Sequence, residues 1–500
     1  MKKITLLFIL IPFLALAQIQ IGQDIDGEAS GDESGWSVSS STNGNIIAIG
    51  ARSNDGTGFT DGFGFNSGQV RVYENINSTW TQLGQDIDGL SQNDAIGHSV
   101  CLSDNGDMLI VGSITSDYNG NNSGQIIVYE NINSVWTQKG QKINGESGAD
   151  LFGFSVDMSS DGNIIAVGSP FNDDNGSNSG SVRIFEYINN NWTQIGQDID
   201  GESISDKSGH CISLSDNGNI VAIGAYENES TSTNNNAWFG HVRVYENINS
   251  TWTQVGQDID GEDSNEQSGR SVSISANGSI VAIGAPENNQ NGNDSGKARV
   301  YENINNIWTQ KGQDIVGENT GDQLGSDVSL SSNGNLLAIS AERNGDNGSN
   351  SGQVRLFEYV NENWTQLGVD INGEDINDGF FGVNIGLASN GNNIIIGAPG
   401  NDGNGSSSGH VRVYDLTNLL SINEFHDTTF QLYPNPAKNQ FTIHLNTSSI
   451  LEKVIIYNTL GQEVLTSENT VIDTSKLASG SYIVEIETNQ GKASKKLIIE

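Results

Sequence analysis

Carboxylate side chains recur in one spacing along much of the chain, in the pattern Asp-x-Asp-Gly-Glu. Hard cations such as Ca²⁺ take several oxygen ligands, so a set of three carboxylates could bind one. Asp and Asn residues that form turns and cap backbone N–H groups would give the same pattern. Both interpretations stay open, and calcium is the only cofactor that these residues suggest. The three most complete sets are Asp24, Asp26 and Glu28; Asp198, Asp200 and Glu202; and Asp258, Asp260 and Glu262.

Aromatic side chains gather in two insertions that could contact a ligand. Residues 57–66 and 228–239 lengthen loops that are elsewhere short and rich in Gly, Asn and Ser. Binding residues are often carried on variable surface loops of a rigid scaffold. We therefore predict ligand contacts at these insertions, made by Phe59, Phe63, Phe65, Trp238 and Phe239.

Catalytic motifs are absent from the sequence. The six histidines are scattered, and there is no G-x-S-x-G, HExxH or Cys/His cluster. Carboxylate pairs are abundant, so glycoside hydrolysis stays open as an alternative. Cys101 and Cys211 are expected to be buried free thiols. These observations favour a binding protein over an enzyme.

A repeated unit carries all of these residues. An Asn-Gly or Asp-Gly turn recurs every 56 to 62 residues, and each repeat holds four short runs rich in Val, Ile, Tyr and Trp. Four strands per repeat at this period are typical of a propeller blade. The predicted fold class is all-β, with a seven-bladed β-propeller over residues 18–418. The turn glycines are Gly44, Gly106, Gly162, Gly218, Gly278, Gly334 and Gly391.

The two ends of the repeat region indicate ring closure. The fourth run is complete in six repeats, whereas the seventh repeat stops after Asp415. Residues 19–27, IQIGQDIDG, match the end of the missing run. The N-terminal strand is therefore predicted to complete the last blade, which leaves only short, protected sheet edges.

An arginine occupies the third run of six repeats, and Ile127 stands in the remaining one. Strand alternation places each arginine on the face opposite its Val or Ile neighbours. We predict a structural role, in which the arginine stacks on a tryptophan of the fourth run. These arginines are Arg71, Arg183, Arg243, Arg299, Arg355 and Arg412.

Charge and the N-terminal segment restrict compartment and partners. Lys2 and Lys3 precede an apolar run that ends at Ala15-Leu16-Ala17, which predicts a signal peptide over residues 1–17 and export. The formal net charge of −39 argues against nucleic acid, because phosphate binding needs clustered Lys and Arg. We expect a monomer that binds a glycan or a surface protein.

A second β-rich module follows the repeats. Residues 419–431 have the character of a linker, and residues 432–500 carry alternating runs that predict a small β-sandwich. The segments 432–436, 454–458, 460–464 and 480–484 resemble the type A C-terminal sorting domain of the Bacteroidetes type IX secretion system. The resemblance implies an interaction with the type IX secretion machinery, export across the outer membrane and removal of the domain. The product would be secreted or held at the cell surface.

The repeats resemble FG-GAP repeats of the integrin-α type. Phe152-Gly153, Asp161-Gly162-Asn163 and residues 166–170 follow that pattern. The family's calcium loop would lie between the first two runs, but here this turn is reduced to SDNGN or SSDGN, without spaced carboxylates. The resemblance favours an exported, non-catalytic, adhesin-like binding protein. The alternative is an extracellular hydrolase or lyase that acts on polysaccharide.

Overall fold

The computed structural model describes residues 18–55, 65–229, 237–374, 381–420, 430–445, 451–458, 463–488 and 491–499. The predicted signal peptide, most of the predicted linker, Phe59 and Phe63 lie outside these residues. The chain divides into two compact regions, Met1–Leu419 and Leu420–Glu500.

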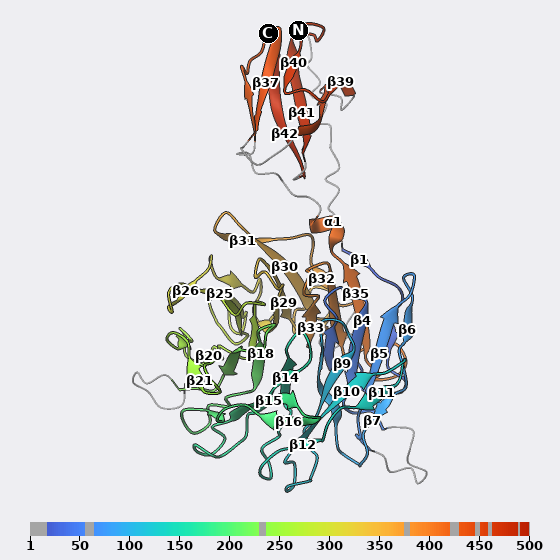
Figure 1. The fold of residues 1–500 in the computed structure, drawn as a ribbon, viewed down its shortest axis with the longest axis vertical. Coiled ribbons are helices and arrows are strands. Elements are labelled where there is room, and N and C mark those ends of the chain that lie inside the picture. Colours follow the sequence, from blue (N-terminus) through green and yellow to red (C-terminus); the bar gives the residue numbers. More distant parts are fainter. Residues whose placement is uncertain are drawn as a thin grey trace. The chain divides into compact units, whose positions relative to one another are not determined.

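The first region consists of antiparallel five-stranded sheets, one for each repeat (Figure 1). Each sheet has a first, a second, a third and a fourth strand in spatial order, and a short fifth strand also pairs with the third. The first strands are β3 (Ser37–Ser40), β8 (Ile96–Leu102), β13 (Ser155–Met158), β18 (Cys211–Leu214), β23 (Ser271–Ile274), β28 (Leu324–Leu330) and β33 (Ile385–Leu387). The second strands are β4 (Ile46–Ala51), β9 (Met108–Ser113), β14 (Ile164–Ser169), β19 (Ile220–Ala225), β24 (Ile280–Ala285), β29 (Leu336–Ala341) and β34 (Asn393–Ala398).

The outer strands complete these sheets. The third strands are β5 (Gln69–Asn75), β10 (Gln125–Asn131), β15 (Ser181–Ile188), β20 (His241–Asn247), β25 (Lys297–Asn303), β30 (Gln353–Val360) and β35 (His410–Asp415). The fourth are β6 (Trp80–Gln82), β11 (Trp136–Gln138), β16 (Asn191–Gln194), β21 (Trp252–Gln254), β26 (Trp308–Gln310), β31 (Asn363–Gln366) and β1 (Ile19–Gln20). The fifth are β7 (Ile87–Asp88), β12 (Ile143–Asn144), β17 (Ile199–Asp200), β22 (Ile259–Asp260), β27 (Ile315–Val316), β32 (Ile371–Asn372) and β2 (Ile25–Asp26). Repeated antiparallel sheets of this kind are consistent with a β-propeller.

The fourth run of each repeat is two short strands rather than the single strand that its sequence suggests. In the first sheet, the chain leaves β6 at Gly84, which has a φ of +84°, and rejoins β5 as β7. A Cβ atom at Gly84 would lie 2.8 Å from Cδ1 of Trp136, so the tryptophan of the next sheet requires a glycine here. The break in the strand therefore makes room for contact between neighbouring sheets.

Each tryptophan of the fourth strands connects two sheets. Nε1 of Trp136 donates to the Leu83 carbonyl at 2.8 Å, and Gln85 exchanges hydrogen bonds with the Trp136 backbone at 2.7 and 3.1 Å. The same contacts recur at Trp80, Trp192, Trp252, Trp308 and Trp364. The predicted stacking of arginine on tryptophan is wrong, because the described arginines of the third strands contact Tyr or Phe rings instead.

The hydrophobic cores lie between neighbouring sheets. One cluster joins Ile110 and Val128 of the second sheet to Val167 and Phe185 of the third, and all four are nearly or fully buried. Equivalent clusters follow from sheet to sheet around the region. Each sheet is thus covered on both faces, which explains the long runs of Val and Ile in the second and third strands.

The first and last sheets of this region are in contact. The N-terminal strand β1 lies beside β35, with Ile19 opposite Asp415, and β2 pairs with the same strand (Figure 1). Backbone hydrogen bonds also run from turn to turn between the first and second strands of successive sheets and return to the start. They are Thr42 N to Asp104 O, Asp104 N to Ser160 O, Ser160 N to Asp216 O, Asp216 N to Ala276 O, Ala276 N to Ser332 O, Ser332 N to Ser389 O and Asn390 N to Thr42 O.

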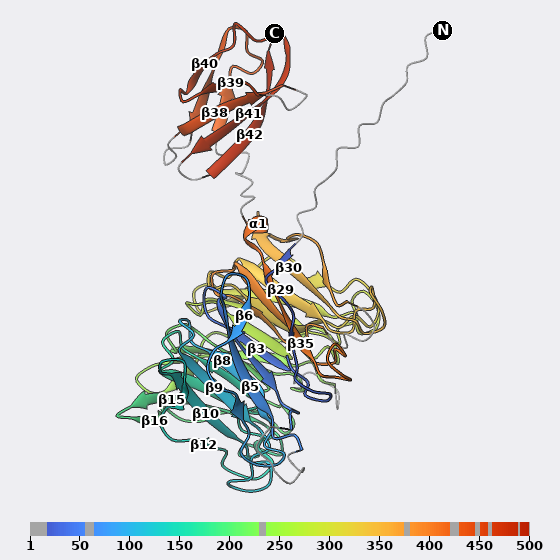
Figure 2. The ribbon, with the colours of Figure 1, turned by 90° about the vertical axis from the view of Figure 1, so that its right-hand side faces the viewer.

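The second region has two antiparallel sheets around one core. One sheet contains β36 (Phe430–Tyr433), β37 (Gln440–Leu445) and β40 (Val471–Asp473). Figure 2 shows strands of the other sheet, whose order is β39 (Glu463–Ser467), β38 (Leu451–Tyr457), β41 (Gly480–Thr488) and β42 (Gly491–Ile499). Side chains of both sheets form one buried cluster, among them Phe441, Ile456 and Leu497. A short helix, α1 (Thr417–Leu420), spans the boundary of the two regions.

Candidate binding site

A cavity of about 800 Å³ lies where the first strands of the sheets converge. Residues at the start of each first strand line it, together with residues that follow the second strands of the fourth, fifth and sixth sheets. The segments that follow the second strands and precede the first strands therefore meet at this cavity.

The residue after the glycine at the start of each first strand is of six different types in the seven repeats. Two positions further on, every repeat has Val or Ile, so the difference is specific to this position. The seven residues are Trp36, His98, Phe154, His210, Arg270, Ser326 and Val383, and all of them line the cavity. The repeats are therefore similar in their framework and different at the cavity.

Four of these side chains form a continuous row of rings. The ring centroids of Trp36 and His98 are 6.0 Å apart, and Phe154 lies 4.8 Å from both His98 and His210. Tyr226, at the end of β19, extends the row at 4.5 Å from His210. Burial lowers the pKa of His98 to about 3 and that of His210 well below its usual range, so both imidazoles are neutral at physiological pH. The row is thus an uncharged aromatic surface.

Charged groups also line the cavity. Arg270 donates from Nη1 to Nε2 of His210 at 2.9 Å, at the end of the aromatic row. Glu287 and Glu342 line the same cavity, and burial raises the pKa of both carboxyls, more than the nearby Arg270 lowers it. The lining therefore combines an apolar surface with a few converging polar groups, as small-molecule sites do.

Asp327 is the most strongly perturbed acid of the lining. It stands where four other repeats have a serine, and it accepts hydrogen bonds from the backbone N–H groups of Val328 and Ile385 at 2.9 and 2.8 Å. Burial nevertheless raises its pKa to about 7. A carboxyl of this kind is partly protonated at neutral pH and could donate as well as accept a proton.

The arginines that lie outside the repeat pattern are found at or beside this cavity. Six of the chain's nine arginines belong to the repeated third-strand positions, and Arg52, Arg270 and Arg343 are the remaining three. Arg270 and Arg343 line the cavity, and Arg52 stacks on the Trp36 ring and pairs with Glu33 at 2.8 Å. The arginines outside the repeat pattern were the signal that sequence reasoning missed.

Both cysteines line this cavity and are free thiols, as expected, but they are half-buried rather than part of the core. Cys101 donates from Sγ to the Asp157 carboxylate at 3.2 Å. Burial raises the pKa of both thiols, that of Cys211 to about 12. They are therefore weak nucleophiles at neutral pH.

The glutamates of the predicted calcium sets form ion pairs with the third-strand arginines. Glu28 lies 3.6 Å from Arg71, and Glu202 lies 3.2 Å from Arg243. Such pairs recur in all repeats but the second, where Leu90 and Ile127 replace both partners. The arginine thus has a structural role, although with a partner that the sequence did not suggest.

The aspartates of these sets make other contacts than the glutamates do. Gln20, Gln194 and Gln254 donate to Asp24, Asp198 and Asp258, respectively. Asp26, Asp200 and Asp260 lie on the fifth strands and offer their backbone carbonyls to the arginines. Because that contact is a backbone contact, Asn144 and Val316 serve equally well in other repeats.

Clusters with the spacing of metal ligands combine different segments from those predicted. Within the described ranges, three groups have ligand atoms that all lie within 4.8 Å of one another. Asp198 joins Glu146 and Asp174, whereas Glu202 and Asp258 join His241. The third group is Glu318, Asp346 and Asp370. Calcium at the three predicted sets stays a prediction as first stated, and Asp24, Asp26 and Glu28 of the first set belong to none of these three groups.

The turns between first and second strands do not fit a cation. In the second repeat, Ser103 Oγ donates to Asn105 Oδ1 and accepts from the Met108 N–H, while Asp107 N donates to the same Asn105 oxygen. Five other repeats have the same arrangement, whereas Ala388 replaces the serine in the seventh, so in six repeats these oxygens close the turn on itself. The resemblance to FG-GAP repeats therefore does not extend to a calcium site in this turn.

The described aromatic residues of the insertions lie apart from the cavity lining. Half of the Phe65 side chain is exposed, and Trp238 is 39% exposed, with its backbone N–H bonded to Asn265. Phe239 accepts a backbone hydrogen bond from Ser268. Their predicted role in ligand binding stays a prediction.

Comparisons with known proteins agree with the two resemblances. Residues 431–500 match the secretion system C-terminal sorting domain, and residues 144–185 match the FG-GAP repeat. A stretch of 85 residues is 36% identical to Beta-agarase A of Zobellia galactanivorans. That match covers 16% of this chain, and the chain spans about 15% of the length of that protein.

These findings define a class of protein: an extracellular or cell-surface protein with FG-GAP repeats. More particularly, its sorting domain marks it for secretion through the type IX system, after which this tail is removed. Among the residues that the structure describes, no helix has the length and apolarity that a membrane crossing requires.

Proposed function

We propose that the chain is a non-catalytic, adhesin-like binding protein on a seven-bladed propeller that its N-terminal strand closes. The five-stranded sheets, the pairing of β1 with β35 and the returning series of backbone hydrogen bonds support this architecture. We expect the protein to act as a monomer, with its ligand in the cavity.

The observation that carries the proposal is the divergence of the seven equivalent residues around the cavity. Framework positions two residues away hardly vary, so the different side chains serve something other than folding. A row of rings from Trp36 to Tyr226, with Arg270 at its end, is suited to one asymmetric ligand.

A glycan fits this lining best. Aromatic rings pack on the C–H faces of sugars, and converging charged groups bind their hydroxyls through strong hydrogen bonds. Arg270, Glu287 and Glu342 would supply those bonds. A polyanion is disfavoured because the chain carries a net charge of −39.

Hydrolysis or lysis of a polysaccharide is the second candidate. The observation in its favour is the pKa of Asp327, which burial raises to about 7, beside a second, half-buried acid, Glu342, whose pKa burial also raises. A general acid needs a carboxyl that is protonated near neutral pH. The similarity to Beta-agarase A covers too little of either chain to carry this argument.

A glycan array probed with the full chain tests the proposal. Phe154→Ser introduces the residue type that Ser326 already has at the equivalent position, so the fold should tolerate it. Trp238→Ala, outside the cavity lining, is the matched control. We expect selective binding that Phe154→Ser weakens about tenfold or more and Trp238→Ala preserves.

The opposite pattern would place the ligand on the insertions rather than in the cavity. Release of reducing ends from a bound polysaccharide, lost in both Asp327→Asn and Glu342→Gln, would replace the binding protein with an enzyme. An array without selective binding would count against a glycan ligand.

A further inference from the structure

The first residue of the third strand also differs among the repeats. The seven residues are Gln69, Gln125, Ser181, His241, Lys297, Gln353 and His410. This position lies beside the glutamate of the Asp-x-Asp-Gly-Glu segment that precedes the sheet and the first aspartate of the segment that follows. It is therefore the point at which two acidic segments meet.

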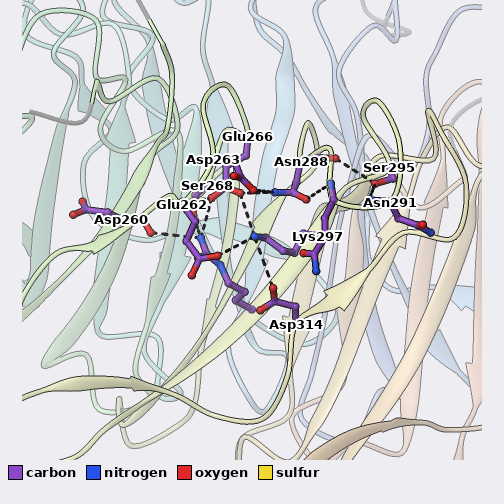
Figure 3. A network of polar contacts seen from close by, with 12 residues as sticks. Asp260, Glu262, Asp263, Glu266, Ser268, Asn288, Asn291, Ser295, Lys297 and Asp314 are labelled. Atoms are coloured by element: carbon purple, nitrogen blue, oxygen red, sulfur yellow. Dashed lines mark hydrogen bonds and ion pairs between the residues drawn. The ribbon is translucent and has the colours of Figure 1, made fainter. Parts of the chain in front are cut away.

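In the fifth sheet, a lysine ammonium occupies this point (Figure 3). Nζ of Lys297 lies 3.2 Å from Glu262 and 3.9 Å from Asp314, and the lysine is 1% exposed. Glu266, which is fully buried, approaches the same ammonium at 3.4 Å. A built-in cation thus sits between the two acidic segments of this sheet.

In the fourth sheet, the equivalent residues are Glu202, His241 and Asp258, and no lysine is present at this position. Their ligand atoms lie within 4.8 Å of one another. His241 is 2% exposed, and its Nε2 atom has no hydrogen-bond partner. A buried polar atom without a partner is costly, and the imidazole that carries it also offers a ring nitrogen within 4.8 Å of two carboxylates, which together indicate a ligand.

We propose that Glu202, His241 and Asp258 bind a divalent metal ion of the zinc class. One imidazole nitrogen and two carboxylates are a typical donor set for such an ion, whereas Ca²⁺ takes oxygen ligands. The carboxylates are oriented by outer contacts, since Glu202 pairs with Arg243 at 3.2 Å and Gln254 donates to Asp258 at 2.6 Å. Glu202 is exposed, so the ion can enter from solvent.

An imidazole binds a metal ion through an unprotonated ring nitrogen, and Nε2 of His241 makes no hydrogen bond that would compete with the ion. The site would connect Glu202, before the fourth sheet, to the third strand of that sheet and to the segment between its fourth and fifth strands. An ion bound only by the folded state would raise its stability.

The seventh sheet provides a natural contrast. His410 is the equivalent residue there, and it lies 3.9 Å from Asp24. However, Nε of Arg412 donates to His410 Nε2 at 3.2 Å, so a guanidinium uses the nitrogen that lacks a partner in His241. We expect metal binding at His241 and not at His410.

Titration of the full chain with ZnCl₂ after chelator treatment tests the proposal. His241→Gln introduces the residue type of Gln69, Gln125 and Gln353 and should preserve the fold; His410→Gln is the matched control. Calorimetry should show one more equivalent of Zn²⁺ in the wild type and in His410→Gln than in His241→Gln. Asp258→Asn should weaken that site about tenfold or more.

A large excess of Ca²⁺ should not displace the additional Zn²⁺ ion from the wild type. Co²⁺ bound in its place should give a visible absorption spectrum that His241→Gln abolishes. Equal Zn²⁺ binding by wild type and His241→Gln would overturn the proposal. So would displacement of Zn²⁺ by Ca²⁺, which would indicate a cluster of carboxylates that binds hard cations without the histidine.

Discussion

Arg183 NH1 lies 3.3 Å from Glu146 Oε1, and the second repeat has lost both partners of the equivalent pair together. Leu90 and Ile127 stand in their places, the leucine exposed and the isoleucine buried. An arginine buried without its carboxylate would be costly, so the two positions change as one. The ion pair thus connects a loop to the sheet that follows it.

Arg183→Ile should lower the free energy of unfolding by about 2 kcal/mol, because it also removes a hydrogen bond to the Asn144 carbonyl. Glu146→Leu should cost about as much, about 2 kcal/mol, because it leaves the buried Arg183 guanidinium without its carboxylate. The double variant, which copies the second repeat, should cost less than the sum of the two. Urea unfolding of all four proteins measures this coupling, and strictly additive costs would contradict it.

Lys297 and Glu266 form a second exchangeable pair. Lys297→Gln alone should destabilise the protein by about 3 kcal/mol, because it leaves the buried Glu266 short of a partner. Adding Glu266→Asp copies the sixth repeat, which has Asp322 and Gln353 at these positions, and should recover most of the loss. Thermal melts compare the two variants; a double variant less stable than the single one would refute the pairing.

Asp327 should make stability depend on pH. Its pKa in the folded protein is about 7, above the usual value of 3.8, so the folded state binds the proton more tightly than the unfolded chain. This contribution is complete below about pH 4 and is lost as pH rises through about 7. Asp327→Asn introduces the residue type that Asn384 has at the equivalent position of the seventh repeat. Its amide does not titrate, so the variant does not lose this stability as pH rises.

The gain in unfolding free energy from Asp327→Asn should therefore grow between about pH 4 and pH 7, by at most about 1.4 kcal/mol per pH unit. Urea unfolding of the wild type and the variant across this range measures it. A difference that does not change with pH would show that the carboxyl keeps an ordinary pKa in the folded protein.

The N-terminal strand should be required for the integrity of the last sheet. Gln23→Ala removes hydrogen bonds to the Trp80 backbone at 3.1 and 3.4 Å and should lower the melting temperature as much as Gln85→Ala does in the interior. Deletion of residues 18–27 should lower it further and cause self-association, because an edge of β35 becomes unpaired. Light scattering after gel filtration detects the association; a monomeric deletion variant with the wild-type melting temperature would contradict the role of the strand.

Sequence periodicity was enough to predict the strands and the position of the N-terminal segment. Strand length and turn chemistry are local properties, and the match of residues 19–27 to the fourth run is visible without a structure. The split of the fourth run was not predicted, because Gly84 owes its conformation to Trp136 of the next sheet. A contact between two sheets cannot be predicted from the residue pattern of a single repeat.

The candidate site was predicted less well for the same reason. The Asp-x-Asp-Gly-Glu sets were read as local groups, whereas Glu202 and Asp258 come from two separate segments and meet at His241. The cavity residues are 56 to 62 positions apart, and only the sheet-to-sheet packing shows that Trp36 and His98 are neighbours. Comparing the repeats position by position would have found them, since Trp36, Phe154 and Arg270 break an otherwise regular pattern.

The pairing of Ile19 with Asp415 has a consequence for the order of folding. A chain made from its N-terminus presents β1 first, yet the strand that receives it, β35, comes almost 400 residues later. Until then, the first strand has no native partner, and the last sheet stays incomplete. Pairing of strands this far apart in sequence carries a large loop-closure cost, so we expect β1 and β35 to pair late in folding. A chain that lacks its last repeat would leave β1 without the strand that pairs with it.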